Sequence, residues 1–221
     1  MFGLQNEDAQ LTRRDCLRLS TGALAVLLNG LHAGEARGQS ISWHDLLREL
    51  TPRATAVYER RMDEDTYVAQ LVQLLRRIDP QLVPTGWHLA RHRYFTVSEF
   101  VIPPGKGFRF HDHRDYNGVL LVAAGSARFR TFEVVGSERM PAAGTPIELR
   151  RTSDRQHAAG ELSSLTTEHD NIHDIRAGES GCRLIDFATM LGPDPRSIYL
   201  DVDEKPLDPA GTRYAASFTS F

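Results

Sequence analysis

The sequence has few cysteines and no excess of charge, and these two shortages exclude several classes of protein. Its 221 residues include only two cysteines, Cys16 and Cys182. Two cysteines allow at most one disulfide, so the chain is not a small domain built on a disulfide framework, and neither belongs to a Cys-x-x-Cys pair. The formal net charge is only −3. This balance gives no basis for nucleic acid as a partner.

Long apolar runs are also missing. The best candidate, residues 19–31, is about 13 residues long, whereas a membrane-spanning helix needs roughly 20. We therefore expect no stable membrane anchor. There is no internal repeat or low-complexity tract, and the composition is that of a globular protein, with 41% hydrophobic and 25% charged residues. A chain of this length can form one domain with a substantial core.

The first 39 residues have the layout of an export signal. The pair Arg13-Arg14 precedes the apolar run, and Ala36-Arg37-Gly38 resembles a cleavage site with small residues. The arrangement is similar to a twin-arginine signal, with Cys16 in place of the usual aromatic residue. We predict that residues 1–39 engage the twin-arginine export machinery transiently and that the protein is exported to the bacterial periplasm. The alternative is an amphipathic first helix of the fold.

Residues 40–80 predict a helical segment. Ser42 with Asp45 is typical of a helix start, and Pro52 is expected to end that helix before a second short one over residues 54–61. A third helix follows from apolar residues spaced three or four apart, at Val68, Leu71, Val72 and Leu75.

Short β-rich runs dominate residues 81–221. Candidate strands at residues 94–102, 108–113, 118–123 and 127–135 alternate with turn residues. Many short strands at regular spacing predict an antiparallel barrel or jelly roll. The expected fold is therefore mainly β, with one barrel domain behind a helical segment.

A pair of histidines stands out in the run His111-Asp112-His113. Residues two apart in a strand point to the same face, so both imidazoles can bind one divalent metal ion, and a third ligand must come from elsewhere. Asn171-Ile172-His173 offers His173, and His169 is the alternative. Taken alone, such a pair can equally be a polar surface feature.

The setting of this pair resembles the first cupin motif. Gly105 is followed by five residues, then by His111 and His113, and Gly125 closes the motif. The resemblance implies a double-stranded β-helix, the jelly-roll barrel of the cupins. Most metal-binding cupins carry a glutamate four residues after the second histidine, where this chain has Asn117. Asp115, expected to face inward, could substitute, but the simpler interpretation is a three-histidine site.

A more specific resemblance covers roughly residues 60–205. The histidine pair, the run from Asn171 to Glu179, the run from Gly181 to Asp186 and Leu191-Gly192-Pro193 look like the cysteamine dioxygenase and plant cysteine oxidase family. The resemblance implies that Fe(II) and O2 convert a small thiol, or an N-terminal cysteine, to the sulfinate. By position, His111, His113 and His173 carry over as the iron ligands.

The resemblance also implies further site residues. Asp186 matches an acidic residue near the family's active site, where it would orient substrate or a water, and Tyr199 matches a residue at the barrel mouth. The chain departs from the family after the histidine pair, with Arg114-Asp115-Tyr116 where the family has Pro-Gly-Met. These three residues and Asn117 are the candidate substrate-binding residues, and they favour a polar substrate.

Two other functions stay open at this point. The chain could be a different metal-dependent cupin enzyme, such as an isomerase or another oxygenase, or a cupin that binds a small molecule without turnover. We expect a monomer whose partners are a small thiol and O2, with no role assigned to Cys182.

Overall fold

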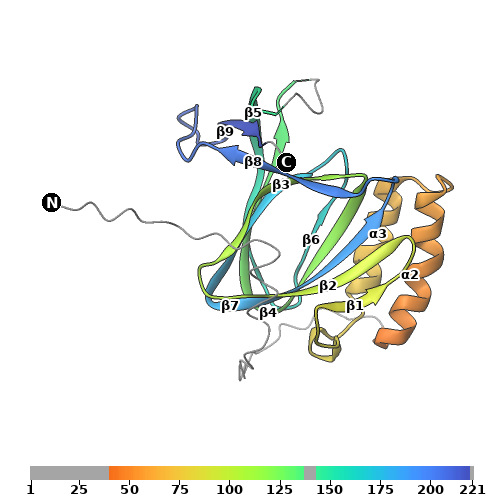
Figure 1. The fold of residues 1–221 in the computed structure, drawn as a ribbon. Coiled ribbons are helices and arrows are strands. Elements are labelled where there is room, and N and C mark those ends of the chain that lie inside the picture. Colours follow the sequence, from red (N-terminus) through yellow and green to blue (C-terminus); the bar gives the residue numbers. More distant parts are fainter. Residues whose placement is uncertain (1–39, 137–142, 220–221) are drawn as a thin grey trace.

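The structure, a computed structural model, describes residues 40–136 and 143–219 (Figure 1). The predicted export signal, residues 1–39, lies outside the described residues. The helical elements come first along the chain: α2 (Trp43–Tyr58), α3 (Glu64–Leu75) and the short 3-10 helix η1 (Pro80–Leu82). The strands that follow are β1 (His88–Arg91), β2 (Phe95–Ile102), β3 (Gly107–Arg114), β4 (Tyr116–Val134), β5 (Pro146–Ala158), β6 (Leu162–Leu165), β7 (Ile172–Met190), β8 (Arg196–Val202) and β9 (Arg213–Phe218).

Both long helices begin at a side-chain cap. The Ser42 hydroxyl accepts a hydrogen bond from the Asp45 N–H at 3.1 Å, and Asp63 accepts one from the Thr66 N–H at 2.8 Å. Each cap satisfies a backbone donor that the first helical turn leaves without a partner. The predicted break at Pro52 is wrong, because α2 continues through it to Tyr58. The buried face on both sides of Pro52, which includes Leu46, Leu50, Ala54 and Val57, keeps α2 packed against the sheet.

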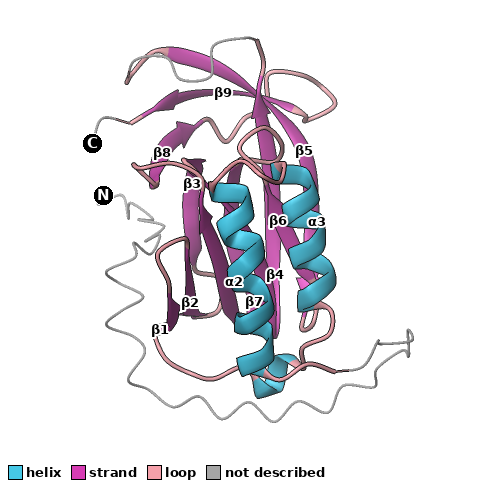
Figure 2. Ribbon diagram, turned by 90° about the vertical axis from the view of Figure 1, so that its right-hand side faces the viewer, coloured by secondary structure: helices cyan, strands magenta, loops and turns pink. Residues whose placement is uncertain are grey.

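The two helices lie side by side over one face of the sheet, in front of β4 and β7 (Figure 2). Their apolar faces bury Leu50 and Leu71 against sheet residues such as Val119 and Phe187. Each fully buried side chain of this kind contributes about 2 kcal/mol relative to an exposed one. Within the described residues, no helix is both long enough and apolar enough to span a membrane.

The hydroxyl of Tyr67 joins the helical layer to the barrel. Tyr67, on α3, is fully buried, and its hydroxyl oxygen lies 2.5 Å from the Thr189 hydroxyl on β7. Burial raises the pKa of the Tyr67 phenol well above its usual range, so the group stays neutral.

We expect Tyr67→Phe to destabilise the protein by about 1–3 kcal/mol, because Thr189 keeps a buried hydroxyl without its partner. Urea unfolding of the Tyr67→Phe and Thr189→Val variants and of the double variant measures the coupling free energy. A double variant that loses the full sum of the two single losses would contradict this coupling.

The strands form one antiparallel sheet that closes on itself. Its order is β1-β2-β7-β3-β8-β9-β5-β4-β6, and an additional pairing between β7 and β4 completes the barrel. Both β4 and β7 are 19 residues long and pair along most of their length, for example Gly118 with Ala188 and Phe129 with Ile175. This arrangement confirms the predicted double-stranded β-helix of the cupin type. It also places His173 near the start of β7 and Asp186 near its end.

Irregularities in the β4–β7 pairing bend these strands around the barrel. The register shifts between Val122 and Ala124 and again between Gly125 and Ala127. Such bulges increase the local twist and bend a strand. The interior that results is filled by apolar side chains, including Phe100, Val122, Phe129, Ile175 and Leu184.

Candidate metal centre

Three histidines meet inside the barrel. His111 and His113 lie on β3, and His173 lies on β7 directly opposite His111 in the register. The three rings contact one another, with centroid separations of 4.6–4.8 Å. One nitrogen from each ring lies within 4.8 Å of the other two. The structure thus brings together the three histidines that the sequence singled out.

Hydrogen bonds to backbone carbonyls orient two of these rings. Nδ1 of His111 donates to the Arg109 carbonyl at 2.7 Å, and Nδ1 of His113 donates to the Asn171 carbonyl at 2.9 Å. A carbonyl only accepts, so each Nδ1 carries a proton, and Nε2 is the ring nitrogen left to bind a metal. Nε2 of His173 lies 3.2 Å from Nε2 of His111. The three Nε2 atoms therefore converge.

Burial keeps His173 neutral. Its side chain is only 2% exposed, and this desolvation, followed by the charges of His111 and His113, holds the pKa of His173 well below its usual range. A metal ligand must offer a deprotonated nitrogen. Imidazole nitrogens suit iron, zinc, copper or nickel, so a donor set of three histidines fits Fe(II).

His169, the alternative third ligand, lies away from this cluster. Its side chain is 64% exposed, and its Nδ1 lies 3.8 Å from a carboxylate oxygen of Glu133. His169 lies in the loop before β7, whereas His173 lies within β7. Only His173 therefore faces His111 and His113.

The backbone conformation of Asp115 determines which side chains after the histidine pair point into the barrel. Asp115 has φ +56°, in the left-handed region, and it separates β3 from β4. The alternation that predicted an inward Asp115 therefore fails, and Asp115 faces an outer cleft instead. Alternation restarts at Tyr116, so Tyr116 and Gly118 line the cavity beside the histidines. Gly118, not Asn117, faces the cavity there.

Asn117 lies on the opposite side of β4. It pairs with Thr189, whose hydroxyl contacts Tyr67 of the helical layer. Asn117 is fully buried, and both polar atoms of its amide have no hydrogen-bond partner among the described residues. Asn117 is thus placed between the barrel wall and the helices, away from the histidine cavity.

The cavity beside the histidines is small and has one polar side. Its volume is about 30 Å³. The apolar side includes Phe100, Phe108, Leu120, Leu165 and Ile175, and the polar side is formed by Tyr116, Asp186, Ser197 and Tyr199. Three predicted site residues, Tyr116, Asp186 and Tyr199, therefore line the cavity beside the histidines.

Tyr116 is held directly against the histidine cluster. Its ring stands at 87° to that of His113, with 4.7 Å between centroids, and its hydroxyl lies 2.6 Å from the Ser197 hydroxyl. Ser197 was not predicted from the sequence. It enters the site because it pairs with His113 across β3 and β8, and only knowledge of that pairing could have identified it.

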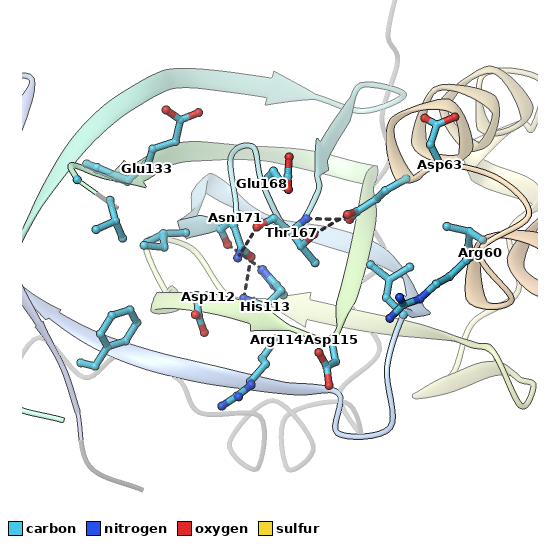
Figure 3. Close-up of a pocket in the computed structure, with 18 of the residues that line it drawn as sticks. Arg60, Asp63, Asp112, His113, Arg114, Asp115, Glu133, Thr167, Glu168 and Asn171 are labelled. Atoms are coloured by element: carbon cyan, nitrogen blue, oxygen red, sulfur yellow. Dashed lines mark hydrogen bonds between the residues drawn. The ribbon is translucent and has the colours of Figure 1, made fainter. Parts of the chain in front are cut away.

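A larger cleft of about 1070 Å³ lies behind His113, between the barrel and the turn that joins α2 to α3 (Figure 3). Arg114 and Asp115 line this cleft rather than the small cavity. Asp112 also lines it, as expected for a residue that points away from the histidines. The Asp112 carboxylate accepts a hydrogen bond from the Ile198 N–H at 3.1 Å, and burial raises its pKa to about 6.

Comparison with known proteins gives one family match. The PCO_ADO family model matches residues 46–194, about two thirds of the chain. A search of curated proteins found no match.

Solved structures resemble parts of the chain. A protein with a double-stranded β-helix domain from Klebsiella pneumoniae is 11% identical, with 50% of this chain and 79% of that chain covered and a TM-score of 0.36. The 11S globulin of Wrightia tinctoria is 15% identical (48% and 22% covered, TM-score 0.36), and procruciferin of Brassica napus is 21% identical (48% and 23% covered, TM-score 0.35). The chain spans less than a quarter of the length of these two globulins.

Proposed function

Because the chain belongs to the PCO_ADO family of cysteine and cysteamine dioxygenases, we propose that it is an Fe(II)-dependent enzyme that oxidises a small thiol or an N-terminal cysteine. The observation that supports this best is the convergence of three imidazoles with no carboxylate among them. The reaction is R–SH + O2 → R–SO2H. The thiol sulfur gives up four electrons, and both oxygen atoms of O2 enter the sulfinic acid.

The three histidines would hold the metal through their Nε2 atoms. When bound, Fe(II) supplies the acidity that favours the thiolate and the redox chemistry that consumes O2. The hydrogen bonds from Nδ1 of His111 and His113 fix the two rings before any ligand arrives. The apolar side of the cavity, which includes Phe100 and Leu120, keeps bulk water away from the reacting sulfur.

The polar side of the cavity would orient the rest of the substrate. The carboxylate of Asp186 is suited to accept hydrogen bonds from an ammonium group, such as that of cysteamine or cysteine. The hydroxyls of Tyr116, Ser197 and Tyr199 are suited to bind a second polar group of the substrate. These polar groups favour a polar thiol that carries an ammonium group.

A panel of thiols tests the proposal. We expect the iron-loaded protein to consume one O2 per thiol with cysteamine, cysteine or a peptide with an N-terminal cysteine, and less with 3-mercaptopropionate, which lacks an ammonium group for Asp186. With 18O2, mass spectrometry should find both labelled atoms in the sulfinate. An iron-loaded sample that consumes no O2 with any thiol would overturn the proposal in favour of an isomerase or a binding protein.

A further inference from the structure

One residue, Asn171, contacts the candidate metal ligand His113 at two points. The Asn171 side-chain oxygen accepts a hydrogen bond from the His113 backbone N–H at 2.8 Å, and its backbone carbonyl accepts one from Nδ1 of the His113 ring at 2.9 Å. The first bond fixes the backbone of β3 at His113, and the second fixes the direction of the ring. Asn171 thus controls where Nε2 of His113 points.

The loop that carries Asn171 is tied to helix α3. Glu64, in the first turn of α3, accepts hydrogen bonds from the backbone N–H of Thr167 at 2.7 Å and from the Thr167 hydroxyl at 2.5 Å. The Asn171 amide in turn donates to the Thr167 carbonyl at 3.5 Å. Figure 3 shows this chain of contacts running from the helix across the cleft to His113.

The far end of the same loop is fixed to the barrel. Asp170 adopts φ +55°, and its carboxylate accepts hydrogen bonds from the hydroxyls of Thr131, at 2.9 Å, and Thr152. The loop before Asn171 is therefore held at two points, at Thr167 by Glu64 of the helix and at Asp170 by the barrel.

Glu64 is not needed to start the helix. Asp63 already provides the side-chain cap of α3, and Asp65 supplies another acidic group in the same turn. The Asp65 side chain is exposed and makes no hydrogen bond or ion pair within residues 40–136 and 143–219. Glu64 and Asp65 thus have the same favourable effect on the helix dipole, but only Glu64 reaches the loop.

We propose that Glu64, Thr167 and Asn171 are positioning residues that hold His113 in the geometry required for metal binding, so that helix α3 takes part in forming the site. The inference rests on the proposed three-histidine metal site. Hydrogen-bond partners of metal-binding histidines orient the ring, and their loss typically costs 10–100-fold in metal affinity. A contact that served stability alone would lower the melting temperature without changing that affinity.

Metal titration of the full chain tests the proposal. The protein is stripped with a chelator and titrated with Co(II), whose absorption bands report the ligand geometry, in competition with a chelator of known affinity. Asn171→Ala removes the acceptor for the His113 backbone N–H but keeps the carbonyl that accepts from the His113 ring. We therefore expect it to weaken Co(II) binding about 10-fold, the lower end of the range for such partners, and Asn171→Asp, which keeps a side-chain acceptor for the His113 N–H, to recover most of it. Glu64→Gln should weaken binding severalfold, whereas Asp65→Asn should bind as the wild type does.

The melting temperature of each metal-free variant separates folding from positioning. The proposal is overturned if Asn171→Ala and Glu64→Gln bind Co(II) as tightly as the wild type, or if Asp65→Asn weakens binding as much as Glu64→Gln. If Asn171→Ala does not fold, the comparison of Glu64→Gln with Asp65→Asn decides. A wild-type protein that binds no Co(II) would refute the three-histidine site itself, whereas normal binding without thiol oxidation would refute only the dioxygenase activity.

Discussion

His173→Ala is expected to abolish stoichiometric iron binding and, with it, thiol oxidation. His173 is the only one of the three candidate ligands that β7 supplies, and its removal leaves two histidines on one strand. Loss of an outer-shell partner already costs 10–100-fold in affinity, so loss of a direct ligand should cost at least about 100-fold. Metal analysis of the purified variant and competition titration with Co(II) measure this loss.

His169→Ala is the matched control. His169 lies four residues earlier in the sequence and was the alternative third ligand, but its side chain is 64% exposed and faces Glu133. We expect this variant to keep the iron content and activity of the wild type. Full iron content in His173→Ala, or loss of iron in His169→Ala, would show that the three-histidine site is wrong. Circular dichroism of both variants checks that the barrel has formed.

The histidine cluster was predictable because its determinants are local in the sequence. Gly105, His111, His113 and Gly125 follow a fixed spacing within 21 consecutive residues, and His173 lies in a second short motif. The mainly β fold was predictable for a similar reason, since strand alternation and turn residues are read over a few positions. The sequence alone could not show that β3 and β7 place His111 opposite His173.

The residues next to the histidines were harder to place. Simple alternation assumes an unbroken strand, and the left-handed Asp115 interrupts it, which reverses the faces expected for the positions that follow. Ser197 depends on the β3–β8 pairing, which has no local signal. The continuation of α2 through Pro52 depends on burial against the sheet, which outweighs the local cost of proline.

The glycines that open and close the histidine motif differ in how much space a side chain would have. Gly105 and Gly125 have similar φ values, +68° and +70°, in the region that favours glycine. A Cβ atom at position 105 would have nothing within 4 Å. A Cβ atom at position 125 would lie 2.1 Å from the backbone oxygen of Gly181. The three nearest atoms all belong to the backbone of Gly181 and Cys182 on β7. No side chain could move aside to make room, so β4 and β7 would have to separate.

Gly125→Ala is therefore expected to destabilise the protein by about 2–5 kcal/mol, the sum of a backbone conformation that costs about 1–2 kcal/mol and steric overlap that costs about 1–3 kcal/mol. Gly105→Ala should lose only the conformational part, about 1–2 kcal/mol. For a chain of this size the larger loss lowers the melting temperature by roughly 4–20 °C. Thermal and urea unfolding of the two variants, compared under the same metal-free conditions, measure the difference. Equal losses at the two positions would mean that β4 and β7 do not approach as closely at Gly125 as the structure places them, and the closure of the barrel beside the histidines would need another explanation.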